Sequence, residues 1–277
     1  MMLYDAHNHL QDTALAPHLP ALMPALRQIG LARAVVNGTR EADWERVAAL
    51  AAEYPWITPS YGLHPWFLKE RTPGWQEALA TRLDDERAGI GEIGLDRWMP
   101  GFDLPDQIGV FTWQLDLATQ RNRPLSIHCL QAWGALWDIL RERPLPPCGF
   151  LLHAYGGPAE MVAGFLQRGA YFSFSGHFLH ERKAAPREIF RTLPADRILV
   201  ETDAPDMPPP PEHRPFTLPD GPDGRTVNHP ANLLAICEGL AKVRGCSVET
   251  LAAQVAENFA RLFGPLPTAS APPSPAA

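Results

Sequence analysis

Histidine and acidic residues recur at the ends of short apolar runs in this chain. In the opening stretch DAHNHL, His7 and His9 stand two residues apart. Residues two apart in a strand point to the same side, so the two imidazoles are expected to lie together. The later runs end in single residues of the same kinds, which are His64 in GLHP, Glu92 in GEIGLD, His128 in SIHC, His153 in LLHAY and Asp203 in ETDAP.

These side chains are typical metal ligands. Imidazole nitrogens and carboxylate oxygens suit Zn²⁺, Mn²⁺, Fe²⁺ or Ni²⁺, and carboxylates also accept Mg²⁺. Even six strong ligands, as remain without His64, are too many for one ion that keeps a position open for water, but six suffice for two ions that share a carboxylate. Glu92, from the middle of the series, is the expected bridge. Two such ions, about 3.5–4 Å apart, can generate a hydroxide and hold the oxygens of a phosphoryl group.

The elements that would carry these residues alternate regularly. Longer helical patterns separate eight β-like runs, several of them continuously apolar, as in strands buried on both faces. This alternation predicts an α/β fold, a (β/α)₈ TIM barrel, in which functional residues gather at the carboxyl ends of the strands. A doubly wound open sheet is the alternative, but no GxGxxG loop follows a strand. The runs begin at Leu3, Arg33, Trp56, Ala88, Pro124, Cys148, Gly169 and Arg197.

Composition narrows the class of protein. The 277 residues carry a net charge of -7, which excludes a general cationic surface for nucleic acid or membranes. The four cysteines form no CxxC pair, and we expect neither a signal peptide nor a membrane-spanning segment. We expect a cytoplasmic monomer without a membrane partner. We also expect a single metal-dependent hydrolase domain over residues 1–264 and a disordered Pro/Ala-rich tail over residues 265–277.

The motifs DAHNHL, GLHPW, GEIGLD, PLSIHC, HAYGG, ETDAP and ENFARLF, in this order, resemble those of the TatD family of metal-dependent hydrolases, the TatD-like deoxyribonucleases. The resemblance runs from residue 5 to about residue 263. It implies a (β/α)₈ barrel with a centre of divalent metal ions. Characterised members are nucleases, often 3′–5′ exonucleases, and some are reported as D-aminoacyl-tRNA deacylases.

The resemblance also implies roles for particular residues. One ion would be held by His7, His9, Glu92 and Asp203, and a second by Glu92, His128 and His153, with Mg, Mn or Zn as the metals. Asp203 would accept the proton of the attacking water, so Asp203, Glu92 and His64 form the expected catalytic set. His64 would contact a phosphate or the leaving group. Glu201 is expected to orient a ligand imidazole.

The chain departs from the family pattern near the expected substrate site. Members commonly carry an arginine shortly after the histidine of the fifth strand, but here Leu130 and Gln131 follow. A guanidinium able to bind a phosphate in two places is therefore missing there, and Arg97 is the candidate replacement. Trp66, together with Trp98 and Trp133, can stack on bases or simply pack. We therefore predict His64, Arg97 and Trp66 as substrate-binding residues.

Two reactions fit this set. The first is hydrolysis of phosphodiesters at DNA or RNA ends, or of a small phosphoester, by a hydroxide formed at the metal centre. The alternative is ester or amide hydrolysis at the same centre, such as deacylation of D-aminoacyl-tRNA. A bridging glutamate in place of a carboxylated lysine favours the first. A histidinol-phosphatase type is disfavoured because ETDAP lacks an Asp-x-His pair, and a metal-binding scaffold without activity remains a third class.

Overall fold

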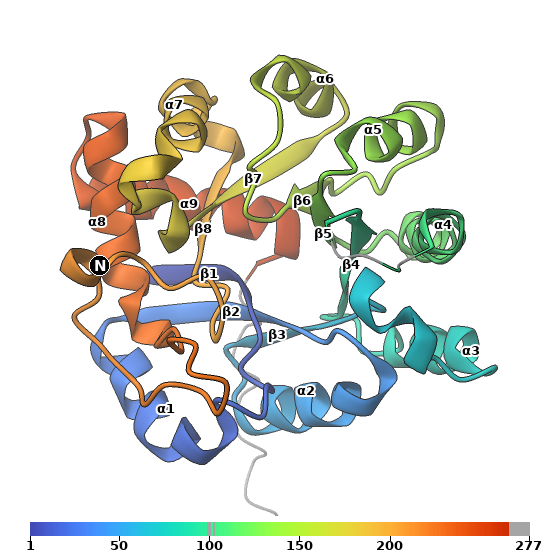
Figure 1. The fold of residues 1–277 in the computed structure, drawn as a ribbon, viewed down its shortest axis with the longest axis horizontal. Helices are drawn as coiled ribbons and strands as arrows, with labels where there is room; N and C mark the ends of the chain where they lie inside the picture. The colour runs from blue at the N-terminus through green and yellow to red at the C-terminus, as the bar shows by residue number, and fades with distance from the viewer. Residues whose placement is uncertain (99–100, 102, 266–277) are drawn as a thin grey trace, which may run out of the picture.

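Eight parallel strands form the centre of the molecule (Figure 1). The computed structural model describes residues 1–98, 101 and 103–265. Each strand pairs with the next along the chain, which confirms the predicted TIM barrel. The expected tail lies outside the described residues except for Pro265, and the single domain stays a prediction. The strands are β1 (Leu3–Asn8), β2 (Leu31–Asn37), β3 (Ile57–Tyr61), β4 (Gly89–Asp96), β5 (Leu125–Leu130), β6 (Phe150–Leu152), β7 (Ala170–Ser175) and β8 (Ile198–Glu201).

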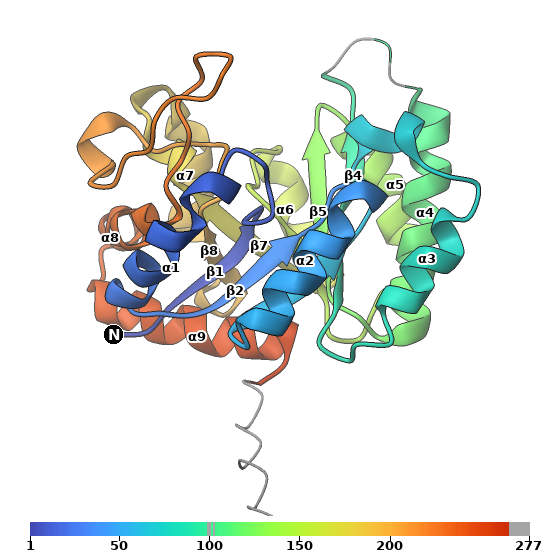
Figure 2. The same cartoon turned by 90° about the horizontal axis from the view of Figure 1, so that it is seen from below.

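Helices surround the strands, and their apolar faces pack against the barrel (Figure 1). The last helix, α9 (Val248–Phe263), packs against β1 and β8 at the end of the barrel opposite the long loops (Figure 2). No helix in the described part of the chain has the length and apolar character needed to cross a membrane. The helices are α1 (Leu19–Gln28), α2 (Glu41–Glu53), α3 (Trp75–Arg82), α4 (Leu104–Arg121), α5 (Trp133–Glu142), α6 (Val162–Gln167), α7 (Ala184–Thr192), α8 (Leu233–Arg244) and α9 (Val248–Phe263).

The first and last strands meet through hydrogen bonds at their carboxyl ends. The amide of Asp203 donates to the carbonyl of His7 at 3.0 Å, and the amide of His9 donates at 2.8 Å to the carbonyl one residue after Asp203. Below them, the buried carboxylate of Asp5 accepts hydrogen bonds from the Thr202 amide at 3.0 Å and from its hydroxyl at 2.6 Å. This seam therefore places His7, His9 and Asp203 next to one another.

Glycine allows the close approach of β4 and β5 at the same end of the barrel. Gly94 adopts a φ of +154°, and a Cβ atom there would lie 1.9 Å from the carbonyl oxygen of His128. No other residue fits this position without displacing the backbone of β5. The glycine in GEIGLD thus brings Glu92 and His128 together on neighbouring strands.

Candidate metal centre

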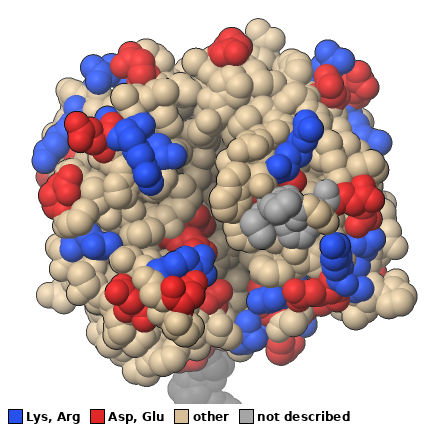
Figure 3. All heavy atoms as spheres, viewed as in Figure 1, with Lys and Arg blue, Asp and Glu red and all other residues tan. Residues whose placement is uncertain are grey.

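The structure brings all seven predicted residues to one end of the barrel. Glu92 and His128 lie within β4 and β5, and the others lie in β1 or just after a strand end. All are buried except His128, which is partly exposed. The face in Figure 3 is hollowed at its centre, where acidic side chains are visible inside the opening. The residues are His7, His9, His64, Glu92, His128, His153 and Asp203.

Four donor atoms form a first group. The Nε2 atoms of His7 and His9 lie 3.3 Å apart. Glu92 Oε2 lies 3.4 Å and 3.3 Å from them, and Asp203 Oδ1 lies 3.6 Å and 3.4 Å from them. Ligands placed tetrahedrally around an ion, at roughly 2.0–2.2 Å, are about 3.3–3.6 Å from one another. The distances from the two imidazole nitrogens to each other and to each carboxylate oxygen therefore suit ligands of one ion, and His7, His9 and Glu92 form one compact group of candidate ligands.

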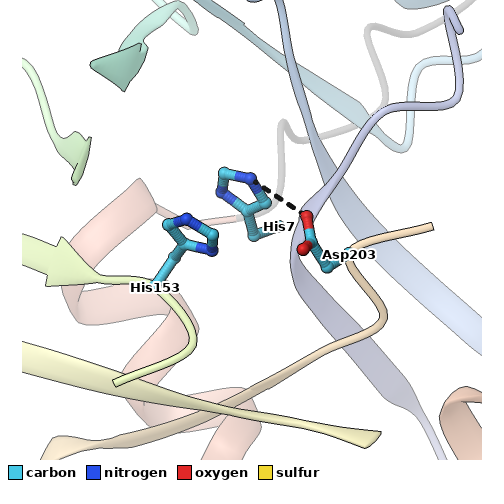
Figure 4. A group of neighbouring side chains, drawn as sticks. All are labelled: His7, His153 and Asp203. Carbon is cyan, nitrogen blue, oxygen red and sulfur yellow. Dashed lines mark ion pairs between the residues drawn. The ribbon is translucent and has the colours of Figure 1, made fainter. Parts of the chain in front are cut away.

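A second group gathers around the other oxygen of Glu92. Glu92 Oε1 lies 2.9 Å from His153 Nε2 and 3.2 Å from His128 Nδ1. These two nitrogen atoms are 3.3 Å apart. The ring of His153 also stacks on that of His7, with centroids 4.1 Å apart, so the two groups adjoin. Figure 4 shows His153, His7 and Asp203 converging on this space.

Glu92 links the two groups, because each of its carboxylate oxygens faces a different set of nitrogens. Burial favours the neutral carboxyl, but the surrounding histidines outweigh this and hold the pKa of Glu92 well below its usual value. Asp203 is also buried, and its hydrogen bond with His9 lowers its pKa. Both side chains are therefore ionised, as metal ligands must be.

The outward nitrogens of three imidazoles contact groups that only accept hydrogen bonds. His9 Nδ1 lies 2.7 Å from the Asn37 carbonyl oxygen, and His128 Nε2 lies 2.9 Å from Asp96 Oδ2. His153 Nδ1 lies 3.5 Å from Glu201 Oε1. The outward nitrogens of His9 and His128 therefore carry a hydrogen, and in the neutral ring the inward nitrogen offers its lone pair to the centre. These two partners thus fix the tautomer that could bind metal, whereas His153 Nδ1 has no hydrogen-bond partner among the described residues.

His64 differs from the other histidines. Its Nδ1 accepts a hydrogen bond from the Trp66 amide at 3.2 Å, so the neutral ring carries its hydrogen on Nε2. Burial lowers the pKa of His64 to about 4, which keeps the ring neutral. Its Nε2 faces the centre, 3.4 Å from Glu92 Oε1. His64 therefore presents a hydrogen-bond donor where the other rings present lone pairs.

Histidine protonation in the metal-free centre varies with position. Burial opposes charge on His9, but its hydrogen bonds to Asp203 and Glu92 outweigh burial and raise its pKa well above the usual value. The pKa of His153 is raised in the same way by Glu92 and Glu201. The pKa of His7 is lowered, because burial and the neighbouring His153 both disfavour its charge.

Sequence reasoning missed two residues that position the candidate ligands. Asp96 Oδ2 accepts hydrogen bonds from His128 Nε2 and, at 2.8 Å, from the Trp66 indole. Ser126 Oγ lies 2.6 Å from His7 Nδ1. The signal for Asp96 was present in GEIGLD, because an even spacing from Glu92 puts both carboxylates on the same side of β4. Nothing in PLSIHC distinguishes Ser126 from an ordinary strand residue.

The expected substrate-binding residues lie around the opening. Trp66 packs edge-on against His64, with ring centroids 5.1 Å apart. Arg97 is exposed, its amide donates to the Leu130 carbonyl at 2.9 Å, and its side chain forms no ion pair within the described residues. Glu201 is fully buried and accepts a short hydrogen bond from Ser173, so it is held beside His153.

Comparison with known proteins identifies the family. The model of the family described as TatD related DNase matches residues 4–264. The chain belongs to this family. Among its relatives, the 3′-5′ ssDNA/RNA exonuclease TatD of Erwinia tasmaniensis is 30% identical, over 94% of this chain and 99% of that protein. The metal-dependent hydrolase YabD of Bacillus subtilis is 28% identical, over 95% and 99% of the two chains.

A solved TatD-family structure has the same fold. The crystal structure of YjjV, a TatD homologue from Escherichia coli K12, superposes with a TM-score of 0.85 at 25% identity. The match covers 94% of this chain and 97% of that chain. Together with the His, Glu and Asp groups at the barrel end, family membership confirms that this TatD-family protein is a metal-dependent hydrolase. The number of ions and the role of each ligand stay predictions.

Proposed function

We propose that this TatD-family enzyme is a two-metal phosphodiesterase that shortens single-stranded DNA or RNA from the 3′ end. The observation that carries the proposal is the position of Glu92 between two donor groups. One ion would be held by His7, His9, Glu92 and Asp203. The other would be held by Glu92, His128 and His153, with Mg, Mn or Zn as the metals. The activity that the name of the Erwinia tasmaniensis relative states supports the choice of substrate.

Divalent ions bound in this way would lower the pKa of water and neutralise charge on a phosphoryl group. The protein supplies the remaining functions. Asp203 is ionised and lies at the edge of the first group, where its carboxylate can take the proton of the attacking water. The water oxygen would then bond to phosphorus as the bond from phosphorus to the 3′ oxygen of the preceding nucleotide breaks, and that oxygen would take up a proton to become the new 3′ hydroxyl.

His64 and the residues beside it would receive the substrate. The Nε2–H of the neutral His64 ring can donate a hydrogen bond to a phosphate or leaving oxygen next to Glu92. Arg97 would contact the strand backbone, since its guanidinium has no acidic partner among the described residues. Trp66 would form the wall behind His64. Glu201 and Asp96 would keep the His153 and His128 rings in place.

The test is a cleavage assay on 5′-labelled single-stranded DNA and RNA, with the protein reconstituted separately with Mg²⁺, Mn²⁺ or Zn²⁺. We expect a ladder of products shortened from the 3′ end, and none with Asp203→Asn. Asp116→Asn, on the exposed side of α4, is the control for folding. An absence of cleavage with every metal, or equal cleavage by Asp203→Asn, would refute the proposal.

One observation favours a second reaction, ester hydrolysis. Leu130 occupies the place where family members commonly carry arginine, so the phosphate there would have one contact fewer. A centre of the same kind can attack an acyl carbon, as in deacylation of D-aminoacyl-tRNA. Turnover of D-aminoacyl-tRNA without cleavage of any phosphodiester would establish this reaction instead. A cytoplasmic location and a monomeric state stay predictions.

A further inference from the structure

Three tryptophans lie near the opening, but they differ in what their rings contact. The Trp66 indole donates a hydrogen bond to Asp96 at 2.8 Å. Trp133 packs against Tyr155, with ring centroids 4.7 Å apart, and is part of the interface between α5 and the barrel. Trp98, by contrast, leaves 56% of its surface in water. Of these three tryptophans, Trp98 is therefore the most exposed, whereas Trp66 and Trp133 are partly buried.

A second exposed apolar residue lies at the end of the neighbouring strand. Leu130 is 37% exposed and ends β5 next to the end of β4, where the amide of Arg97 donates to its carbonyl. Within the described residues, the remaining large hydrophobic side chains with this much exposure are Met1 and Met2 at the N-terminus. Leaving a Trp and a Leu exposed at the ends of neighbouring strands gives up the free energy of burying them. A bound ligand would recover part of it.

The backbone of Trp98 is held in place relative to the second donor group. The carboxylate of Asp96 accepts a hydrogen bond from the Trp98 amide through Oδ1, at 2.7 Å, and from the His128 ring through Oδ2, at 2.9 Å. One rigid, buried side chain thus connects the backbone of Trp98 to a candidate metal ligand. A group stacked on Trp98 would belong to the same substrate whose phosphate lies at the centre.

We propose that Trp98 and Leu130 form a subsite that binds one nucleobase of the substrate strand by stacking. The inference rests on the proposed nuclease function and names the part of the substrate that this wall binds. A base has a flat apolar face that matches an indole, and every base has one, so the contact tolerates any sequence. The neighbouring Arg97 would pair with a backbone phosphate. This subsite would therefore stack on a base at the position of Leu130, where family members commonly carry an arginine.

The experiment removes either the Trp98 ring or one base of the substrate. Single-stranded substrates carry an abasic residue at one of the last three positions from the 3′ end, and they are cleaved by the metal-loaded wild type and by Trp98→Ala. We expect Trp98→Ala to lower kcat/KM on intact DNA by roughly 5- to 150-fold, the range for loss of one stacked base. With the abasic residue at one of these positions, kcat/KM of the wild type should fall by a similar factor, and Trp98→Ala should then lower it little further. Trp98→Phe should restore most of the rate.

Further comparisons separate this role from others. Met2→Ala removes an equally exposed side chain at the other end of the barrel and should leave kcat/KM unchanged. The ratio of wild type to Trp98→Ala should stay constant between about 50 mM and about 200 mM salt, whereas the effect of Arg97→Gln should shrink, because only charge contacts are screened. Equal losses by Trp98→Ala on intact and abasic strands, or no loss at all, would overturn the stacking subsite. If the wild type cleaves no strand, the proposed nuclease function itself fails.

Discussion

The role of Asp96 can be tested by Asp96→Asn. Among the described residues, its carboxylate accepts hydrogen bonds from the His128 ring, the Trp66 indole and the Trp98 amide. Asparagine has one acceptor oxygen, so its amide NH₂ group must face one of these donors. If the NH₂ group faces His128, the ring hydrogen moves to Nδ1, the nitrogen that faces Glu92, and this tautomer cannot bind metal there.

The expected size of the effect follows from the role of an orienting partner. Loss of such a partner lowers metal affinity by about 10- to 100-fold, or roughly 1.4–2.7 kcal/mol. Only the ion held by His128 and His153 should be affected. The measurement is calorimetric titration of the metal-free protein with Mn²⁺ or Zn²⁺, in which the two sites are fitted separately.

Ser126→Ala is the matched variant, because Ser126 contacts His7 in the other donor group. It should weaken the first site and spare the second, so the two substitutions should give opposite patterns. If Asp96→Asn weakens both sites equally, or neither, the reasoning about tautomers is wrong. Thermal unfolding of both metal-free variants checks that the barrel is intact.

Three further predictions follow from the fold and the centre. Metal affinity should rise with pH, because the pKa values of His9 and His153 are raised and an ion must displace their protons. Calorimetric titrations in buffers of different ionisation enthalpy should show this proton release. If no proton is released, the histidine protonation described here is wrong. Gly94→Ala should destabilise the protein by more than about 2 kcal/mol in denaturant unfolding, because the added Cβ would clash with β5. Gly109 is exposed within α4 and has no neighbour near its Cβ position, so Gly109→Ala should stabilise the protein by about 0.5–1 kcal/mol. Equal effects of the two substitutions would contradict the predicted clash at Gly94. Asp5→Ala leaves two buried donors of Thr202 without their acceptor, so it should lower the free energy of unfolding by about 2–4 kcal/mol. A change below about 0.5 kcal/mol would show that the seam between β1 and β8 does not depend on this carboxylate.

The sequence was sufficient to predict the barrel and the gathering of the candidate site residues at one end of it, because both follow from local patterns. The apolar runs identified the eight strands, and a histidine or acid at a strand end must lie at the carboxyl end of a parallel barrel. GEIGLD placed Glu92 in the middle of the series. The structure then showed that its two oxygens face different sets of nitrogens.

Other features depend on contacts between distant parts of the chain and could not be predicted. The tautomer of His64 is set by the Trp66 amide, and that of His9 by the Asn37 carbonyl. Trp98 and Trp133 follow motifs in similar ways, yet one is exposed and the other is packed against Tyr155. Spacing along the sequence carries no information on such packing.

The seam between β1 and β8 has a consequence for how the protein matures. As the chain leaves the ribosome, His7 and His9 emerge first, but their partner Asp203 emerges only with the last strand. The second donor group comes from β4, β5 and the end of β6, so it is complete earlier. An ion bound between β1 and β8 would thus stabilise the last step of barrel closure. In cells short of metal, the first and last strands of newly made chains would then separate more readily, and these strands would be more susceptible to proteolysis.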